Sequence, residues 1–233
     1  MAAPAPLVLI PALIATARLY ARQLPELWRE GPVMIADHTR HDSMSALAGA
    51  VLDAAPPHFA LAGLSLGGYI SFEIMRQAPE RVLKLALLDT SARPDVPERT
   101  EQRRTQIGLA RGGRLDEVAE MLFPKFVHAE REGDEQLRAL VHSMAADTGP
   151  EAFVRQQTAI MNRPDSRPDL GAIDCPTLVL VGDGDELTPP DVAAEIADGI
   201  DGARLVVVPH CGHLSTIERP AEATRALVEW RSG

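Results

Sequence analysis

The sequence predicts an α/β protein built on a parallel β-sheet of about six strands, and three observations support this fold class. Short apolar runs recur along the chain, and each is followed by a loop and a segment of helical periodicity. Several runs are continuously apolar, which is typical of parallel strands covered by helices on both faces. The alternation stops once, between Pro94 and Pro168, where charged helical segments replace it. We therefore expect a doubly wound, mostly parallel sheet with one helical insertion.

The predicted strands are the apolar runs at residues 7–10, 33–36, 59–62, 82–88, 177–181 and 204–208. The first run lies between Pro6 and Pro11, and prolines are tolerated at strand ends. It overlaps an apolar stretch, residues 5–17, that ends like a secretory cleavage site. No positive charge precedes that stretch, so we favour a buried strand over a signal peptide.

Helical periodicity between these runs gives the predicted helices. Residues 44–52 place apolar side chains on one face, and Ser43 precedes them as an N-cap. Residues 69–77 follow the same pattern until Pro79 ends the helix. A further helix is expected just after Thr188, because the prolines that follow it are tolerated in a first turn.

The helical insertion divides the predicted core into two parts. We expect a core of residues 1–93 and 169–233, with residues 94–168 forming a helical cap on the sheet. Large apolar side chains of the insertion either line a substrate pocket or anchor the cap on the core, and both interpretations stay open. These side chains are Met121, Phe123, Phe126, Met144 and Met161.

The charge balance excludes several classes of partner. The chain has 33 acidic and 23 basic side chains, a formal net charge of −10. This charge would repel phosphate backbones and anionic lipid, so we expect no nucleic-acid or membrane partner, and it also disfavours strongly anionic substrates. No apolar run reaches the roughly 18 residues of a membrane helix. The two cysteines, Cys175 and Cys211, cannot form a disulfide framework, which suits a cytoplasmic protein.

A serine between two glycines is the clearest sign of chemistry in the chain. Gly63-Leu-Ser65-Leu-Gly67 follows one predicted strand and opens a predicted helix, which is the arrangement of a nucleophile elbow. So tight a turn leaves no space for side chains on its flanks, which explains the two glycines. Ser65 Oγ would then project above the sheet beside the amide of Leu66, at a helix N-terminus that favours negative charge. We expect Ser65 to be a catalytic nucleophile.

A serine nucleophile needs a general base, which a histidine at a later strand end would supply. His213 lies in the loop after the last predicted strand, and Gly212 gives that loop the freedom to turn the ring over the sheet. His210 lies three residues closer to the strand and is the alternative.

The base in turn needs an acid that holds its tautomer. Asp185 lies midway along the loop after residues 177–181, from where it can reach the next strand end. Asp183 in the same loop and Asp89 at the end of another strand are the alternatives.

The order Ser65, Asp185, His213 is that of α/β-hydrolases. The chain resembles this superfamily, in its esterase and enol-lactonase-like branch. The segments that carry the resemblance are Leu7-Val-Leu-Ile-Pro11, Ala62-Gly-Leu-Ser-Leu-Gly-Gly-Tyr69, Val179-Leu-Val-Gly-Asp-Gly-Asp185-Glu-Leu-Thr-Pro189 and His210-Cys-Gly-His213-Leu. The resemblance implies an acid three residues after the glycine that ends its strand, which supports Asp185, and it implies a helical cap at residues 94–168.

Two departures from the family pattern affect the expected site. Many relatives carry His-Gly after their first parallel strand, whereas this chain has Pro11-Ala12-Leu13. By position, the backbone amides of Leu13 and Leu66 would form the oxyanion hole, since an amide needs no particular side chain. Relatives often begin with two extra strands, and this chain reaches the oxyanion strand by residue 7, so we expect all strands to be parallel.

The remaining polar clusters predict no cofactor. His38-Thr-Arg-His41-Asp42 has no further ligand group in sequence, so we expect solvated or hydrogen-bonded loop residues there and no metal site. Cys211 is expected to be a small buried neighbour of the site, with a reactive thiol as the alternative. No glycine-rich nucleotide motif is present.

These residues together predict a cofactor-free serine hydrolase, a monomer or homodimer, that acts on a small-molecule carboxylic ester, thioester or lactone. C–C bond hydrolysis, acyl transfer and perhydrolysis would use the same triad and are alternative activities. A ligand-binding protein that keeps the fold without turnover is an alternative of a different class.

Overall fold

The computed structural model describes residues 5–233 and has a sheet of six parallel strands in the order β2-β1-β3-β4-β5-β6. The strands are β1 (Leu7–Ile10), β2 (Val33–Ile35), β3 (Phe59–Leu64), β4 (Val82–Leu88), β5 (Thr177–Gly182) and β6 (Arg204–Val208). The predicted α/β fold class and the all-parallel sheet are confirmed. The strand β3 continues past the predicted end at residue 62, because Gly63 and Leu64 still pair with β4.

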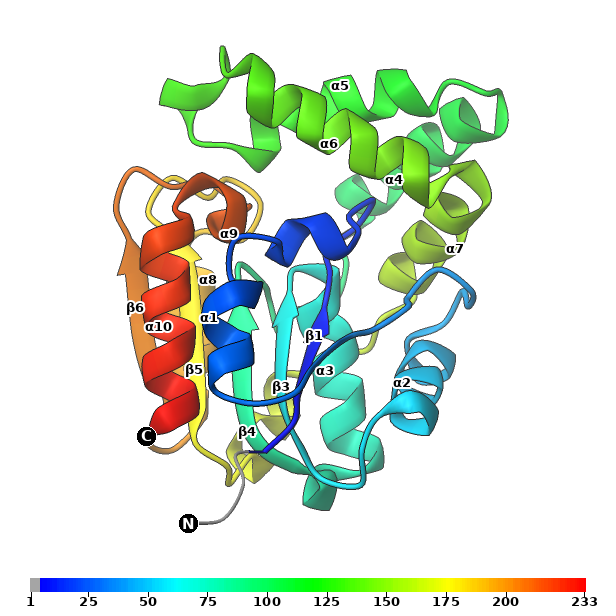
Figure 1. The fold of residues 1–233 in the computed structure, drawn as a ribbon. Coiled ribbons are helices and arrows are strands. Elements are labelled where there is room, and N and C mark those ends of the chain that lie inside the picture. Colours follow the sequence, from blue (N-terminus) through cyan, green and yellow to red (C-terminus); the bar gives the residue numbers. More distant parts are fainter. Residues whose placement is uncertain (1–4) are drawn as a thin grey trace.

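Helices cover both faces of the sheet (Figure 1). On one face lie α1 (Leu24–Arg29) and α10 (Pro220–Ser232), and on the other lie α2 (Met44–Ala54), α3 (Leu66–Gln77) and α8 (Pro190–Gly199). The central strands are therefore apolar on both sides, and β1, β3 and β5 are buried along their whole length. This burial explains the continuously apolar runs of the sequence.

The helical insertion lies above the carboxyl ends of the strands (Figure 1). It contains α4 (Pro97–Arg111), α5 (Leu115–Phe126), α6 (Glu135–Thr148) and α7 (Pro150–Met161), with the short 3₁₀ helix η3 (Ala129–Arg131) between α5 and α6. We call the segment from α4 to α7 the cap. Because the carboxyl ends of parallel strands carry the functional loops of an open α/β sheet, the cap covers the region where a site is expected.

Two short helices between β1 and β2 have no counterpart in the prediction. The 3₁₀ helix η1 (Ala17–Tyr20) is capped by Thr16, whose side chain accepts a hydrogen bond from the Arg18 amide, and α1 follows with Pro25 in its first turn. Such short helices depend on tertiary contacts more than on periodicity. Here the buried Tyr20 hydroxyl donates to the carbonyl of Ile10, 3.0 Å away, and anchors η1 on the end of β1.

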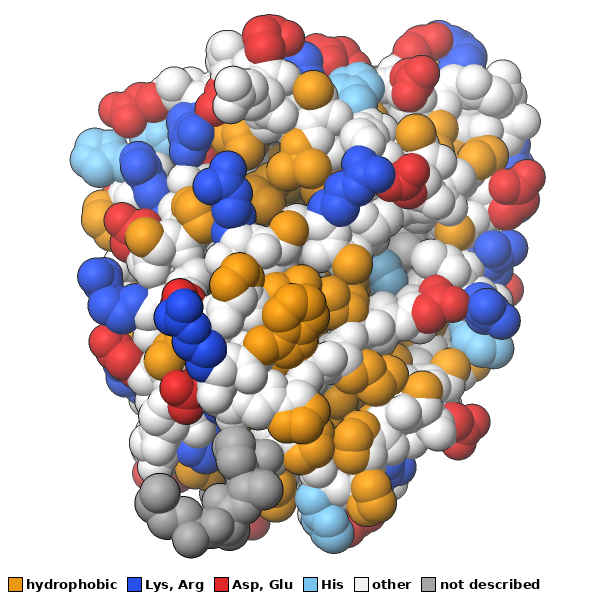
Figure 2. All heavy atoms as spheres, in the orientation of Figure 1, with side chains coloured by type: hydrophobic (Ala, Val, Ile, Leu, Met, Phe, Trp, Pro, Cys, Tyr) orange, Lys and Arg blue, Asp and Glu red, His pale blue; other side chains and the backbone are white. Residues whose placement is uncertain are grey.

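Acidic and basic side chains are interspersed over the face shown in Figure 2, and apolar side chains gather over its centre. The net charge of −10 is thus not gathered into one acidic patch on this face. Within residues 5–233, no helix has the length and apolar character that crossing a membrane would require.

Candidate active site

Ser65 lies at a strained turn between β3 and α3. Its backbone has φ of +54°, which is unusual for a residue with a side chain, and such strain is found mainly at functional sites. A Cβ atom on Gly63 would lie 2.2 Å from the carbonyl oxygen of Gly67, and one on Gly67 would lie 2.1 Å from that of Ile10. Both flanks of the serine therefore have to be glycine, as the elbow interpretation requires.

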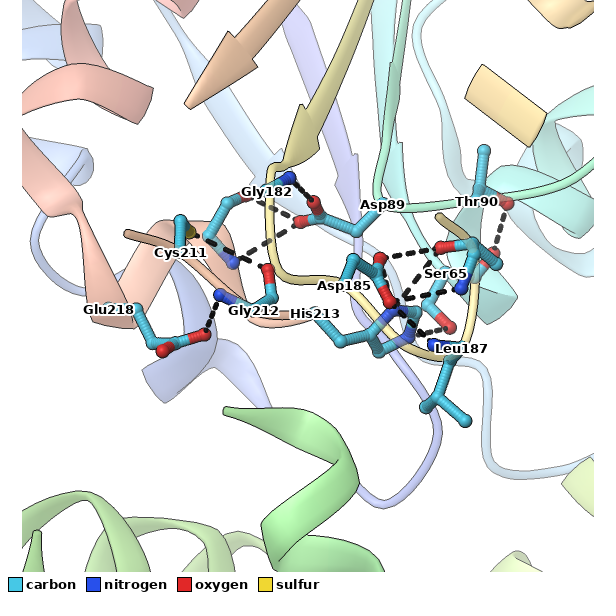
Figure 3. A network of polar contacts seen from close by, with 12 residues as sticks. Ser65, Asp89, Thr90, Gly182, Asp185, Leu187, Cys211, Gly212, His213 and Glu218 are labelled. Carbon is cyan, nitrogen blue, oxygen red and sulfur yellow. Dashed lines mark hydrogen bonds and ion pairs between the residues drawn. The ribbon is translucent and has the colours of Figure 1, made fainter. Parts of the chain in front are cut away.

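His213 lies in the loop between β6 and the short helix α9 (Ser215–Glu218), directly beside Ser65 (Figure 3). Its Nε2 is 2.8 Å from Ser65 Oγ, and the ring is almost entirely buried and stacked on Phe126 of the cap at 6.0 Å. His210, the alternative base, is exposed and lies 3.3 Å from Glu130 of the cap through its Nδ1. The structure thus brings His213, and not His210, to the serine.

Asp185 completes the line of contacts from the loop after β5. Its Oδ2 is 2.8 Å from His213 Nδ1, while the amides of Leu187 and Thr188 and the Thr188 hydroxyl donate to the same carboxylate. Burial alone would raise the pKa of Asp185, but the neighbouring His213 and these hydrogen bonds outweigh it and lower the pKa. The carboxylate is therefore held ionised, which suits an acceptor for the His213 N–H.

The other two candidate acids contact different groups. Asp183 accepts a hydrogen bond from the Cys211 amide at 3.1 Å. Asp89 is fully buried at the end of β4 and accepts from the Gly182 amide and from both the amide and hydroxyl of Ser215 (Figure 3). Burial and the nearby Asp185 raise the pKa of Asp89. Asp89 thus ties together the loops that carry the acid and the base, a role that the sequence did not indicate.

The segment proposed to supply the second oxyanion amide follows β1. Leu13 lines the same cavity as Ser65, and Leu66 is the first residue of α3. The next residue, Ile14, has φ of +49°, and its amide donates to the buried Gln156 of the cap at 3.1 Å. A backbone in this conformation is held by its neighbours, so a cap residue fixes the turn beside Leu13.

His38 contacts the same turn through the backbone of Ala12. It is buried, and its Nε2 lies 2.9 Å from the carbonyl oxygen of Ala12. Burial lowers the pKa of His38, which favours the neutral ring as an N–H donor to this carbonyl. The sequence left open whether the residues of this loop are solvated or hydrogen-bonded. His38 is hydrogen-bonded and buried.

Comparison with known proteins identifies the family. A sequence model described as the alpha/beta hydrolase fold matches residues 41–220, more than half of the chain. The chain belongs to the α/β-hydrolase family. The matched region contains Ser65, Asp185 and His213.

Several of the similar proteins are named as hydrolases. The chain is similar to the enol-lactonase from Burkholderia xenovorans LB400, with 26% identity, a TM-score of 0.89, and 100% of this chain and 93% of that chain covered. A thermophilic esterase from Thermogutta terrifontis is 29% identical with a TM-score of 0.89, covering 97% of this chain and 89% of its own. The pimeloyl-(acyl-carrier protein) methyl ester esterase of Nitrosomonas europaea is 28% identical over 190 residues, which is 78% of this chain and 74% of the relative. These similarities support a hydrolase activity for this α/β-hydrolase.

A cavity of about 520 Å³ lies between the core and the cap and contains Ser65 and His213 in its wall. Of the apolar cap residues considered from the sequence, Met121 and Phe126 line this cavity. Phe123 and Met144 are instead fully or almost fully buried, and the Arg138 guanidinium of α6 lies over the Phe123 ring, 4.4 Å from its centroid. The pocket interpretation thus fits Met121 and Phe126, and the burial of Phe123 and Met144 fits a packing role.

A group that could hold a metal ion lies outside this cavity. Ligand atoms of His128, Glu130 and His210 lie within 4.8 Å of one another, where the cap meets the loop after β6. The sequence did not indicate this group, because its members are brought together from distant segments. The Glu130 amide already donates to His128 Nδ1 at 3.2 Å, so that nitrogen is engaged.

Cys211 is fully buried next to the site, and burial raises the pKa of its thiol. A thiol with a raised pKa is a poor nucleophile. This burial favours the structural interpretation of Cys211 over the reactive one.

Proposed function

We propose that this α/β-hydrolase is a serine hydrolase that cleaves a small carboxylic ester, thioester or lactone through an acyl-enzyme on Ser65. The observation that supports the proposal is the continuous line of contacts from Ser65 Oγ through His213 to Asp185, with 2.8 Å at each link. Nucleophile, base and orienting acid are thus within hydrogen-bond reach of one another, which is the geometry that nucleophilic catalysis needs.

In this mechanism, Ser65 Oγ attacks the substrate carbonyl as its proton passes to His213 Nε2. Asp185 keeps the His213 proton on Nδ1 and stabilises the imidazolium that forms. The amides of Leu13 and Leu66 donate hydrogen bonds to the oxyanion, where one donor is typically worth about 2.7–4 kcal/mol of transition-state stabilisation.

The tetrahedral intermediate then collapses as His213 protonates the leaving alcohol or thiol. In a lactone, this alcohol stays attached to the acyl group. His213 next takes a proton from a water molecule that attacks the acyl-enzyme, and Ser65 is regenerated as the carboxylic acid leaves.

Hydrolysis of p-nitrophenyl acetate and butyrate tests the proposal. We expect Ser65→Ala to reduce turnover to the uncatalysed background while circular dichroism shows an unchanged fold. The matched control is Ser45→Ala, which removes an exposed hydroxyl from α2 and should keep wild-type turnover. Turnover retained by Ser65→Ala would exclude Ser65 as the nucleophile.

A further inference from the structure

The cavity beside Ser65 has a charge opposite in sign to that of the whole protein. Its lining contains three cationic side chains, Arg99, Arg103 and Lys125, and one anionic side chain, Glu186. The chain as a whole has a net charge of −10. A ligand in a partly enclosed cavity responds mainly to the nearby charges, because solvent and salt screen the distant ones.

One of these cations already has an acidic partner within the protein, although it shares that partner with a second arginine. The Arg103 guanidinium lies 3.2 Å from the buried Asp95 carboxylate, which also pairs with Arg163 at 3.0 Å. Burial would raise the pKa of Asp95, but Arg103 and Arg163 outweigh it and lower the pKa, so this carboxyl stays ionised between the two guanidiniums. Arg103 also donates to the side chain of Gln157, which fixes its position.

Arg99 differs from Arg103 in having no acidic partner. Its Nη1 donates to the carbonyl of Leu187 at 2.9 Å, and no carboxylate among residues 5–233 lies within 4.0 Å of its guanidinium. A guanidinium carries five N–H donors in a planar fork that matches a carboxylate. Most of the Arg99 donors therefore remain available on the wall of the cavity.

The contact with Leu187 also places Arg99 beside the catalytic loop. The Leu187 amide donates to Asp185 at 2.8 Å, and the Leu187 carbonyl accepts from Arg99. The backbone of Leu187 therefore connects Arg99 of the cap to the proposed acid of the core. Lys125 comes from α5, next to the Phe126 ring that stacks on His213. In the part of the chain that the structure describes, Lys125 makes no ion pair.

We propose that Arg99, assisted by Lys125, binds a carboxylate on the substrate while Ser65 attacks an ester, thioester or lactone carbonyl elsewhere in the same molecule. The preferred substrate class is thus a half-ester, which carries a free carboxylate and the scissile ester in one molecule. This inference rests on the proposed function, and it replaces the expectation from net charge that anionic substrates are disfavoured. Pairing of a guanidinium with a carboxylate is among the stronger and more directional polar contacts in proteins.

The direct test compares monomethyl esters of dicarboxylic acids, from succinate to suberate, with the corresponding dimethyl esters. We expect the best half-ester to exceed its dimethyl ester about tenfold in kcat/KM, mainly through KM. Arg99→Gln should lower the ratio of the two kcat/KM values about tenfold, Lys125→Gln about threefold, and Arg99→Lys much less than Arg99→Gln. The control is Arg104→Gln on the same helix, since Arg104 is exposed and paired with Glu101, and its ratio should stay within twofold of wild type.

Two results would overturn the inference. One is equal kcat/KM for half-esters and dimethyl esters in the wild type. The other is a loss in Arg99→Gln that affects both substrates equally, since that would mean that Arg99 only positions the Leu187 loop.

Calorimetric binding of free adipate to the Ser65→Ala variant separates this inference from the proposed function. This readout needs no turnover, so adipate that binds Ser65→Ala, and binds at least tenfold more weakly once Arg99→Gln is added, supports the carboxylate site even if no ester is cleaved. An enzyme that cleaves esters but shows no adipate binding sensitive to Arg99→Gln retains the proposed function and excludes the carboxylate site.

Discussion

The core wall and the cap wall of the active-site cavity differ in how firmly their polar groups are held. On the core side, Ser65, Asp185 and His213 are buried, and each has hydrogen-bond partners close in sequence or in the adjoining strand-end loop. On the cap side, Arg103 is held by Asp95 and Gln157, but Met121 and Lys125 are exposed. Lys125 makes no ion pair within residues 5–233. In the proposed mechanism, the reacting groups thus lie on a wall held by several hydrogen bonds, whereas part of the cap wall is exposed and less constrained.

This difference has a physical origin in the backbone. The core residues stand on strand ends whose register is fixed by a parallel ladder, and glycines allow the chain segments to approach closely. The cap residues stand on helices that pack mainly on one another, α4 on α7 and α5 on α6. Substitutions of the same type should therefore have very different effects in the two regions.

The largest effect is expected for Gly67→Ala in the core. The added Cβ would lie 2.1 Å from the carbonyl oxygen of Ile10, which is backbone and cannot move aside without shifting β1. We expect the free energy of unfolding to fall by about 3 kcal/mol and esterase activity to be lost, because the elbow and the Leu13 turn move together. Urea denaturation and p-nitrophenyl acetate hydrolysis measure both. A variant with wild-type stability would mean that the elbow is less tightly packed than described.

Asp89→Asn should have the next largest effect. The Asp89 carboxylate accepts hydrogen bonds from three donors, which are the Gly182 amide and the amide and hydroxyl of Ser215. An asparagine would replace one carboxylate oxygen with an NH₂ group, which would then face one of these donors. We expect the free energy of unfolding at neutral pH to fall by about 1–3 kcal/mol.

The pH dependence of the Asp89→Asn effect has a definite sign. The pKa of Asp89 is raised in the folded protein, so the folded state holds this proton more tightly than the unfolded state does. The wild type therefore gains stability as the pH falls through that raised pKa, and the asparagine variant does not. Urea denaturation at a series of pH values should show a difference between the two proteins that grows as the pH is lowered toward the ordinary pKa of an aspartate, and a difference that shrinks on acidification would contradict the assignment.

The smallest effect, and one of opposite sign, is expected for Gly108→Ala in the cap. Gly108 lies inside α4, and nothing lies within 4 Å of the position of an added Cβ. Alanine is favoured over glycine within a helix, so the free energy of unfolding should rise by about 0.5–1 kcal/mol. Thermal denaturation measures this gain. A destabilised Gly108→Ala would indicate that the cap is as tightly constrained as the core.

The same contrast explains how much could be predicted from the sequence. The elbow around Ser65 and the predicted parallel sheet are local patterns, in which residues a few positions apart set the backbone. Asp185 and His213 could be proposed because each follows a predicted strand, and strand ends meet at one edge of a parallel sheet. The hydrogen bonds of Asp89 to Ser215 join residues that are far apart in the chain, so no local pattern could reveal them.

The cap was the least predictable part for the same reason. Helical periodicity located its segments, but it gave no sign that Arg103 pairs with Asp95 whereas Arg99 has no acidic partner among residues 5–233. That distinction depends on how α4 lies against α7 and the Leu187 loop. The net charge of −10 therefore does not predict the charge of the cavity lining, which has three cationic side chains and one anionic side chain.

Labelling with a fluorophosphonate probe tests the central claim most directly, because the probe reacts only with a serine activated by its base. The account predicts one probe per chain, located on Ser65 by peptide mass spectrometry and abolished in Ser65→Ala and His213→Ala. A protein that is correctly folded but unlabelled, or labelled at another serine, would contradict it.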